Sequence, residues 1–273
     1  MYLIERKLIF MKKLKIFSVI AACTMALTMF AGCGVPENSV HGKNDLPGKT
    51  IGVQLGTTGA NLADDVKKDD SSTEVEKFSK GADAVQALKQ GKVDAVIIDY
   101  EPAKAFTEKN DDIEILDEDL TNEDYAIALK LGNEDLQEKI NGALKELKDD
   151  GTLDKIKNNY CGGESYDYKS PEGTKRENGT LIMATNAEFP PYESKEGSNI
   201  VGLDVDMMQA VCDKLGYELK IEDMAFDSII PAIQSGKANV GVAGMTVTED
   251  RKKNVLFSDP YTTSRQVIIV RKK

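Results

Sequence analysis

The residues whose types could do chemistry are few, and several of them stand where a short apolar strand ends. Thr57 and Thr58 follow the apolar run at 50–54, at a Gly/Thr turn that leads into a helix. Backbone N–H groups and a hydroxyl at such a turn can hold an anion. Arg251, in "TVTEDR", carries a planar guanidinium that can bind both oxygens of a carboxylate, although in the run "EDRKK" it could equally be a solvated surface charge. Asp99 adds a carboxylate at the end of the strand "DAVIID".

The composition removes several classes of function. His41 is the only histidine, which argues against His-based zinc sites and His-dependent nucleophile triads. The net charge of -11, with no long basic run in the body of the chain, argues against a nucleic-acid partner, because binding phosphates needs clustered Lys and Arg. We therefore expect no metal, no cofactor and no nucleic acid.

Two segments of the chain echo each other. "ALKQGKVDAVIID" (87–99) and "AIQSGKANVGVAGM" (232–245) both read as the end of a helix, a Gly-Lys stop and a buried strand. Glycine supplies a left-handed helix cap, and lysine suits the negative end of the helix. With 273 residues, of which 41% are hydrophobic, the chain can hold two such units. The pattern predicts an α/β protein with two similar lobes.

The middle of the chain separates these lobes. Residues 133–160 read as two helices broken at Gly151, with Leu136, Ile140, Leu144 and Leu147 on one face. Residues 161–179 are polar and Gly-rich without periodicity, which indicates a linker. Cys161 and Cys212 could pair, although the helical spacing around Cys212 favours a buried core position.

The N-terminus has the layout of an export signal: Lys12, Lys13 and Lys15, an apolar run, then small residues before Cys33. It resembles a bacterial lipoprotein signal, which implies that residues 1–32 are removed, that Cys33 is lipidated and that 33–46 form a tether. The alternative is a plain transmembrane anchor, for which the apolar run is short. We expect an exported protein, held by lipid alone at the outer face of the cytoplasmic membrane.

A family resemblance becomes specific at six blocks: "ATNAEFPPYE", "VGLDVDMMQAV", "AFDSIIPAIQSGKANV", "AGMTVTEDRKKNVLFSDPYTTS", "GKTIGVQLGTTG" and "GADAVQALKQGKVDAVIID". All of them resemble the solute-binding proteins of polar amino-acid ABC transporters. The resemblance implies the two-lobe fold of type II periplasmic binding proteins, each lobe a mixed sheet flanked by helices. It also implies a monomer, not an enzyme, that passes a free amino acid to an ABC permease. Relatives of this fold also include cyclic-acid dehydratases and ligand-sensing domains, which stay as alternatives.

The order of these blocks differs from that of the family, where "ATNAEFPPYE" opens the chain. We therefore expect a circular permutant in which residues 47–130 form the second lobe and 180–273 the first. Residues 131–160 would pack on the first lobe, and residues 161–179 would join the family's old termini. A single covalent crossing, near residues 130–133, would then connect the lobes and loosen their opening. The alternative is a segment of a tandem array or a misassembled, non-functional gene copy.

The resemblance also assigns roles to residues. It implies that Arg251 binds the ligand carboxylate together with Thr246, Gly244, Thr58 and Thr57, and that Asp99, with Gly244, takes the ammonium group.

The side-chain pocket is expected at Phe189, Phe226, Asn186, Gln54 and Glu188. Asn186 is neutral at a position where binders of cationic amino acids often carry a carboxylate, so the expected ligand is a polar amino acid, neutral or basic.

Overall fold

Two five-stranded mixed sheets organise the chain, of which the computed structural model describes residues 35–272. The β1 sheet has the strand order β2-β1-β3-β15-β4, and the β7 sheet has the order β11-β7-β12-β6-β13. The strands of the β1 sheet are β1 (Thr50–Gln54), β2 (Glu74–Phe78), β3 (Ala95–Asp99), β4 (Ile113–Ile115) and β15 (Gln266–Arg271). Those of the β7 sheet are β6 (Ala128–Lys130), β7 (Thr180–Thr185), β11 (Glu218–Asp223), β12 (Val240–Gly241) and β13 (Val255–Phe257).

The two sheets repeat one pattern, which confirms the two-lobe α/β fold. β1 pairs in parallel with β2 and β3, and β7 pairs in parallel with β11 and β12. The Gly-Lys stops match as well, because Gly91 and Gly236 both have positive φ, at 70° and 77°. Each glycine and the lysine after it donate to carbonyls of the last helical turn, at 2.9–3.1 Å. The stop therefore ends a helix and turns the chain into a sheet strand in both lobes.

Each sheet takes one antiparallel strand from the segment assigned to the other lobe. β15 pairs with β3 and β4, and β6 pairs with β12 and β13. Both strands lie in the interior of a sheet, where all six residues of β15 and two of the three residues of β6 are buried. The lobes therefore do not follow the expected limits at residues 130 and 180.

A two-stranded ribbon carries the chain between the sheets. It consists of β5 (Glu123–Tyr125) and β14 (Thr262–Ser264), paired antiparallel, and each leads into the strand that joins the other sheet. The chain thus crosses between the lobes twice, side by side. The expectation of a single crossing near residues 130–133 is wrong, because β14 leads into β15, which pairs with β3 and β4 in the β1 sheet.

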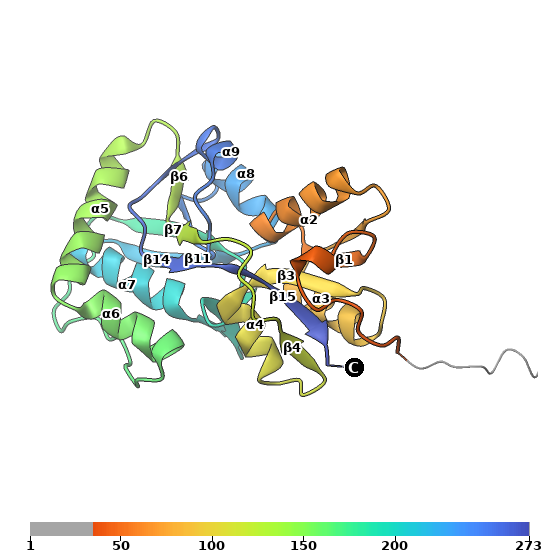
Figure 1. Cartoon of the computed structure of the whole chain (residues 1–273). Coiled ribbons are helices and arrows are strands. Elements are labelled where there is room, and N and C mark those ends of the chain that lie inside the picture. Colours follow the sequence, from red (N-terminus) through yellow and green to blue (C-terminus); the bar gives the residue numbers. More distant parts are fainter. Residues whose placement is uncertain (1–34, 273) are drawn as a thin grey trace, which may run out of the picture. The chain divides into compact units, whose positions relative to one another are not determined.

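Helices cover both sheets (Figure 1). Those beside the β1 sheet are α2 (Thr58–Asp69), α3 (Gly81–Lys89) and α4 (Tyr100–Thr107), and those with the β7 sheet are α5 (Glu134–Asp149), α6 (Thr152–Lys157), α7 (Leu203–Leu215), α8 (Ile229–Gln234) and α9 (Glu249–Lys252). Short elements complete the fold: the 3-10 turns Lys43–Asp45 and Phe226–Ser228, the π-helix Asn158–Gly162, and the antiparallel strands β8 (Glu188–Phe189), β9 (Glu193–Glu196) and β10 (Asn199–Val201).

The linker at 161–179 is fastened to α7. Its Tyr168 donates to Asp213 at 3.1 Å, and its Arg176 forms an ion pair with the same carboxylate at 2.7 Å. The two helices before it break at Gly151 as expected, and three of the four predicted apolar residues there are buried. Cys161 and Cys212 are free thiols, and burial raises both pKa values to about 12.

The first and last strands meet at one residue. The N–H of Thr50 donates to Asp94 Oδ2 at 2.9 Å, and the guanidinium of Arg271 lies 3.9 Å from Asp94 Oδ1. The start of β1 and the end of β15 therefore lie close together at the same end of the β1 sheet, on either side of β3.

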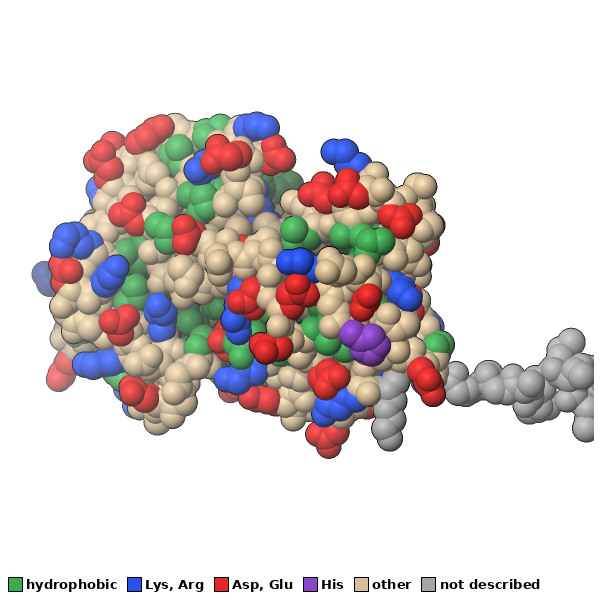
Figure 2. Space-filling model, in the orientation of Figure 1, with side chains coloured by type: hydrophobic (Ala, Val, Ile, Leu, Met, Phe, Trp, Pro, Cys, Tyr) green, Lys and Arg blue, Asp and Glu red, His purple; other side chains and the backbone are tan. Residues whose placement is uncertain are grey.

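The surface mixes charges of both signs, with His41 exposed among them (Figure 2). Among the described residues, no helix is both long and apolar enough to cross a membrane. The predicted signal at 1–32 and the predicted lipidation of Cys33 lie outside these residues.

Candidate functional site

A small pocket lies between the two sheets. It brings together ten of the eleven residues predicted for the site and adds Ala243. Its lining from the β1 sheet and its loops is Gln54, Thr57, Thr58 and Asp99, and from the β7 sheet and its loops Asn186, Phe189, Phe226, Ala243, Gly244, Thr246 and Arg251. Segments at opposite ends of the sequence thus build one site.

The start of α2 faces the pocket at the turn after β1. Thr57 caps the helix by accepting the N–H of Ala60 at 3.2 Å, while its own hydroxyl donates to the carbonyl of Gln54 at 2.7 Å. The turn depends on Gly56, whose φ of +80° favours glycine. This end of α2 presents the positive end of a helix dipole to the pocket.

Arg251 reaches across the pocket to that same turn. Its guanidinium donates to the carbonyl of Thr246 at 2.7 Å and to that of Gly56 at 3.0 Å. A guanidinium has five N–H donors, so these two bonds leave donors for a ligand anion. Burial lowers the pKa of Arg251, while the carboxylates of Glu123 and Asp99 act in the opposite direction. Arg251 therefore lines the pocket and is only partly exposed to solvent.

The carboxylate of Asp99 does not cap the helix that it precedes. It occupies the N-cap position of α4, yet its side chain makes no capping bond and instead accepts a hydrogen bond from the hydroxyl of Tyr125. Burial raises the pKa of Asp99 to about 7, and the carboxylate of Glu123 adds to the rise. The site thus holds a carboxyl group that would gain from a cationic partner.

Glu123 is a buried carboxylate that the sequence analysis missed. From the ribbon strand β5, its Oε2 accepts hydrogen bonds from Thr58 of one lobe at 3.0 Å and from Thr246 of the other at 2.7 Å. Gln266 adds a third bond at 3.1 Å. Two threonines predicted to bind the ligand are therefore linked to each other through the ribbon between the lobes.

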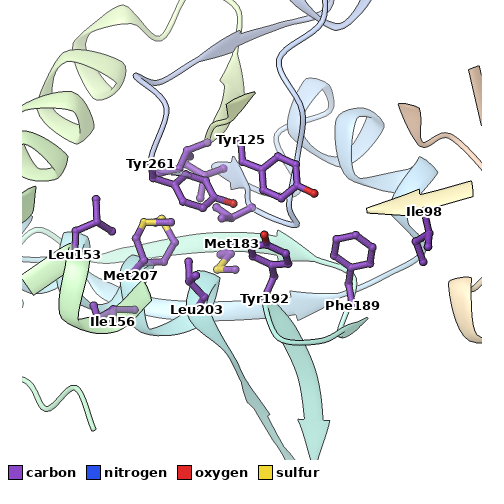
Figure 3. Close-up of a cluster of buried hydrophobic side chains, with 14 of the residues drawn as sticks. Ile98, Tyr125, Leu153, Ile156, Met183, Phe189, Tyr192, Leu203, Met207 and Tyr261 are labelled. Carbon is purple, nitrogen blue, oxygen red and sulfur yellow. The ribbon is translucent and has the colours of Figure 1, made fainter. Parts of the chain in front are cut away.

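Aromatic rings form the apolar walls of the site. Phe189 stacks on Tyr192 with ring centroids 5.8 Å apart, and Tyr125 meets Tyr192 edge-on at 5.2 Å. The guanidinium of Arg251 lies over the ring of Phe226 at 5.3 Å, within cation–π range. Figure 3 shows Tyr125, Tyr192 and Phe189 gathered beside one another.

Amides close the remaining side of the pocket. Gln54 donates to Asn186 at 2.9 Å, so these two predicted residues join the lobes. Glu188, the eleventh predicted residue, lies next to this side but outside the lining, and its carboxylate is paired with Lys80 at 2.6 Å.

The residues that sequence reasoning missed share a cause. Glu123 and Tyr125 stand in the polar stretch "LTNEDYAIAL", and Gln266 opens an apolar strand, so neither composition nor spacing distinguishes them. Only the pairing of β5 with β14 brings them to the pocket.

Comparison with known proteins identifies a family for part of this chain. Residues 181–273 match the model of bacterial extracellular solute-binding proteins, family 3. The chain is similar to the arginine-binding extracellular protein ArtP of Bacillus subtilis (strain 168), with 44% identity over 103 residues, 38% of this chain and 40% of that protein. It is also similar to a probable histidine-binding protein of Neisseria gonorrhoeae, with 36% identity over 113 residues and 41% of each protein.

Two solved structures are similar to parts of the chain. The arginine-bound form of domain 1 from TmArgBP is 45% identical over 35% of this chain and 82% of that chain, with a TM-score of 0.30. An ancestral arginine-binding protein bound to arginine is 51% identical over 30% of this chain and 37% of that chain, also with a TM-score of 0.30.

The chain spans about 40% of the length of these curated relatives. These two relatives are named for binding arginine and histidine. Residues 181–273 of the chain therefore belong to the bacterial extracellular solute-binding proteins of family 3.

Proposed function

We propose that the chain captures a free polar amino acid between its two lobes and delivers it to an ABC permease. The observation that carries this proposal is one pocket that holds the cation of Arg251 and the start of α2 together with the carboxyl group of Asp99. A free amino acid presents a carboxylate and an ammonium group, and each must exchange its hydration for a charge-assisted partner. The pocket offers one partner to each.

The carboxylate of the ligand would lie between Arg251 and the turn at Thr57 and Thr58, with Thr246 and the backbone of Gly244 beside it. The fork of Arg251 can hold both oxygens, which the single ammonium of lysine cannot copy. Since Arg251 and the turn come from different lobes, a bound carboxylate would hold the lobes together.

The ammonium group would lie at Asp99, near the backbone of Gly244. The pKa of about 7 means that Asp99 carries a proton below neutral pH in the unliganded protein. An ammonium ligand favours the ionised carboxylate, so binding would release that proton.

We therefore expect affinity to fall below neutral pH, toward a limit of about tenfold for each pH unit between about pH 7 and pH 5. Titration calorimetry across this range, in two buffers of different ionisation enthalpy, measures both the affinity and the proton release. A dissociation constant that stays flat across the range would contradict the role of Asp99.

The side chain of the ligand would extend between Phe189 and Phe226 toward Gln54 and Asn186. These amides suit a polar end group, neutral or basic, and the similar proteins are named for arginine, histidine and cystine. Glu188 would join the pocket only if Lys80 released its carboxylate.

The order of the segments is best explained by circular permutation. The neighbouring ends of β1 and β15, both at Asp94, support it, because a permutation joins and cuts a fold where its ends lie close. The linker at 161–179 also supports circular permutation. It would join the family's old termini, and it is held against α7 by the contacts of Tyr168 and Arg176 with Asp213. The alternatives, part of a tandem array or a misassembled copy, would lack a working site.

Export and a lipid anchor at Cys33 complete the proposal, with the monomer as the binding unit. Family membership supports an extracytoplasmic location.

A thermal-unfolding screen against the twenty amino acids, after denaturing and refolding to remove carried-over ligand, tests the proposed function. A ligand at a thousand times its dissociation constant should add about 4 kcal/mol of stability. A cooperative transition that no amino acid moves would contradict the proposal.

A further inference from the structure

A pair of carboxyl groups is buried beside the pocket without forming part of its lining. Glu193, on β9, and Asp204, in the first turn of α7, are both fully buried. Among residues 35–272, no N–H group and no hydroxyl group donates to either carboxylate oxygen of Glu193 or to the Oδ1 of Asp204. None of the ion pairs within that range includes either residue. Two buried carboxyl groups without a cation need another explanation.

The backbone forces the two groups together. The N–H of Leu203 donates to the carbonyl of Pro191 at 3.1 Å, and the N–H of Asp204 donates to the carbonyl of Tyr192 at 3.0 Å. Gly202 makes this approach possible, because a Cβ there would lie 2.1 Å from the carbonyl oxygen of Tyr192. The start of α7 is thereby held against the chain that enters β9, and the carboxyl groups of Glu193 and Asp204 are within hydrogen-bonding reach of each other.

Two carboxylates in contact in a buried site cannot both be ionised, so one of them keeps a proton and donates it to the other. Burial raises the pKa of Glu193 well above its usual range, and the carboxylate of Asp204 adds to the rise. Burial raises the pKa of Asp204 to about 6, against the lowering effect of its hydrogen bonds.

None of the other titratable groups that act on Glu193 lowers its pKa. The carboxylates of Asp99, after β3, and Asp223, at the end of β11, raise the pKa of Glu193 further. The hydroxyls of Tyr192 and Tyr261 are neutral, because burial raises both of their pKa values.

More distant groups surround Tyr192, which lies beside the pair. Cys161, in the π-helix, and Glu101, in α4, raise the pKa of Tyr192 together with Asp99 and Asp204. Every one of these groups is neutral or acidic, so a proton, and not a nearby cation, balances the pair.

The pair is connected to the ligand site through Asp204. Its Oδ2 accepts the N–H of Gly244 and the hydroxyl of Tyr261, both at 2.9 Å. Gly244 lines the pocket with φ at +52°, and a Cβ there would lie 2.9 Å from the ring of Phe189. Figure 3 shows Tyr261 beside Tyr125, which donates to Asp99, with Tyr192 reaching toward Tyr125 from the chain below. The backbone of Gly244, which lines the pocket, is therefore held by one carboxylate oxygen of Asp204.

We propose that Glu193 and Asp204 share a single proton and together position Gly244 for the ligand, so that amino-acid binding weakens when the pair loses that proton at alkaline pH. Glu193 and Asp204 are positioning residues, since neither lines the pocket. The effect on affinity rests on the proposed function, whereas the shared proton does not.

The test compares Glu193→Gln with the unsubstituted protein by following the Gly244 amide resonance and the dissociation constant of an amino acid that the thermal screen identifies. Glutamine donates a fixed hydrogen bond to Asp204 and so imitates the protonated pair. In the unsubstituted protein we expect the Gly244 resonance to shift and the affinity to fall about tenfold as the pair ionises above neutral pH. In Glu193→Gln we expect the affinity at neutral pH to be kept and this alkaline transition to be lost.

Glu196→Gln, an exposed substitution on the same strand, is the matched control and should behave as the unsubstituted protein. The ligand's own ammonium group also titrates at alkaline pH, but it does so equally in all three proteins. A Glu193→Gln profile that coincides with the unsubstituted one, in the resonance and in the affinity, would overturn the proposal.

A measurement without any variant covers the case in which Glu193→Gln fails to fold. With ¹³C-labelled glutamate carboxyl groups, one resonance of the unsubstituted protein should keep the protonated position at pH 7. Full ionisation of every glutamate at that pH would overturn the shared proton. Absence of binding by any amino acid, with the protonated resonance present, would overturn the proposed function and the coupling to affinity, but not the proton.

Discussion

Arg251→Ala is expected to raise the dissociation constant for the amino-acid ligand by at least about a hundredfold. The substitution removes the guanidinium that faces the start of α2 across the pocket. Truncating one partner of a buried charge pair costs about 2–5 kcal/mol, and about 2.7 kcal/mol corresponds to a factor of a hundred. Titration calorimetry with the identified ligand measures the loss.

Two further variants separate this effect from a loss of net charge. Lys252→Ala removes the adjacent positive charge, which is half exposed and paired with Glu249, and should leave the affinity unchanged. Arg251→Lys keeps the charge without the planar fork and should still lose most of the affinity. Equal affinity in Arg251→Ala and Lys252→Ala would remove Arg251 from the site.

Gly202→Ala is expected to destabilise the fold by about 2–6 kcal/mol, because two separate costs add. Gly202 has φ 144° and ψ 176°, a region open almost only to glycine, and strain of this kind costs about 1–3 kcal/mol. The new Cβ would lie 2.1 Å from the carbonyl oxygen of Tyr192, and overpacking against backbone adds about 1–3 kcal/mol. Urea unfolding followed by circular dichroism gives the change in the free energy of unfolding.

Gly197→Ala is the matched control for this substitution. Gly197 precedes β10 with φ at +62°, and no atom lies within 4 Å of the place where its Cβ would be. The strain then acts without a clash, so the loss should be about 1 kcal/mol. Similar losses in the two variants would show that the approach of α7 to β9 is not tight.

Local patterns predicted much of this molecule. The Gly-Lys stops at 91–92 and 236–237 predicted two similar lobes, because a glycine cap followed by a buried strand is a local signal. The break at Gly151 and the helices around it were equally local, and ten of the site residues lie together in the pocket, as the resemblance implied.

The partition of strands between the lobes could not be predicted in the same way. Nothing local in "QVIIVRKK" states which sheet the strand enters, since β15 is an apolar strand that would suit either. Its place follows from pairing with β3 and β4, far away in sequence. The second crossing at β14 and its ribbon with β5 also depend on pairing between segments far apart in sequence.

Buried polar residues were the other omission. Glu123, Glu193 and Asp204 stand in segments that also contain less buried acidic residues, and a charge pattern does not reveal which carboxylate is buried. The backbone bonds near Gly202 and the pairing of the ribbon determine their burial, and both depend on the folded chain.

The measurement that tests the central claim most directly compares the identified amino acid with two of its own derivatives. One derivative is N-acetylated and lacks the ammonium group, and the other is the α-carboxamide and lacks the carboxylate. If Asp99 and Arg251 hold the two ends of the ligand, calorimetry should show binding of the free amino acid and a loss of at least about a hundredfold for each derivative. Equal binding of all three would contradict a pocket built for the charges of a free amino acid.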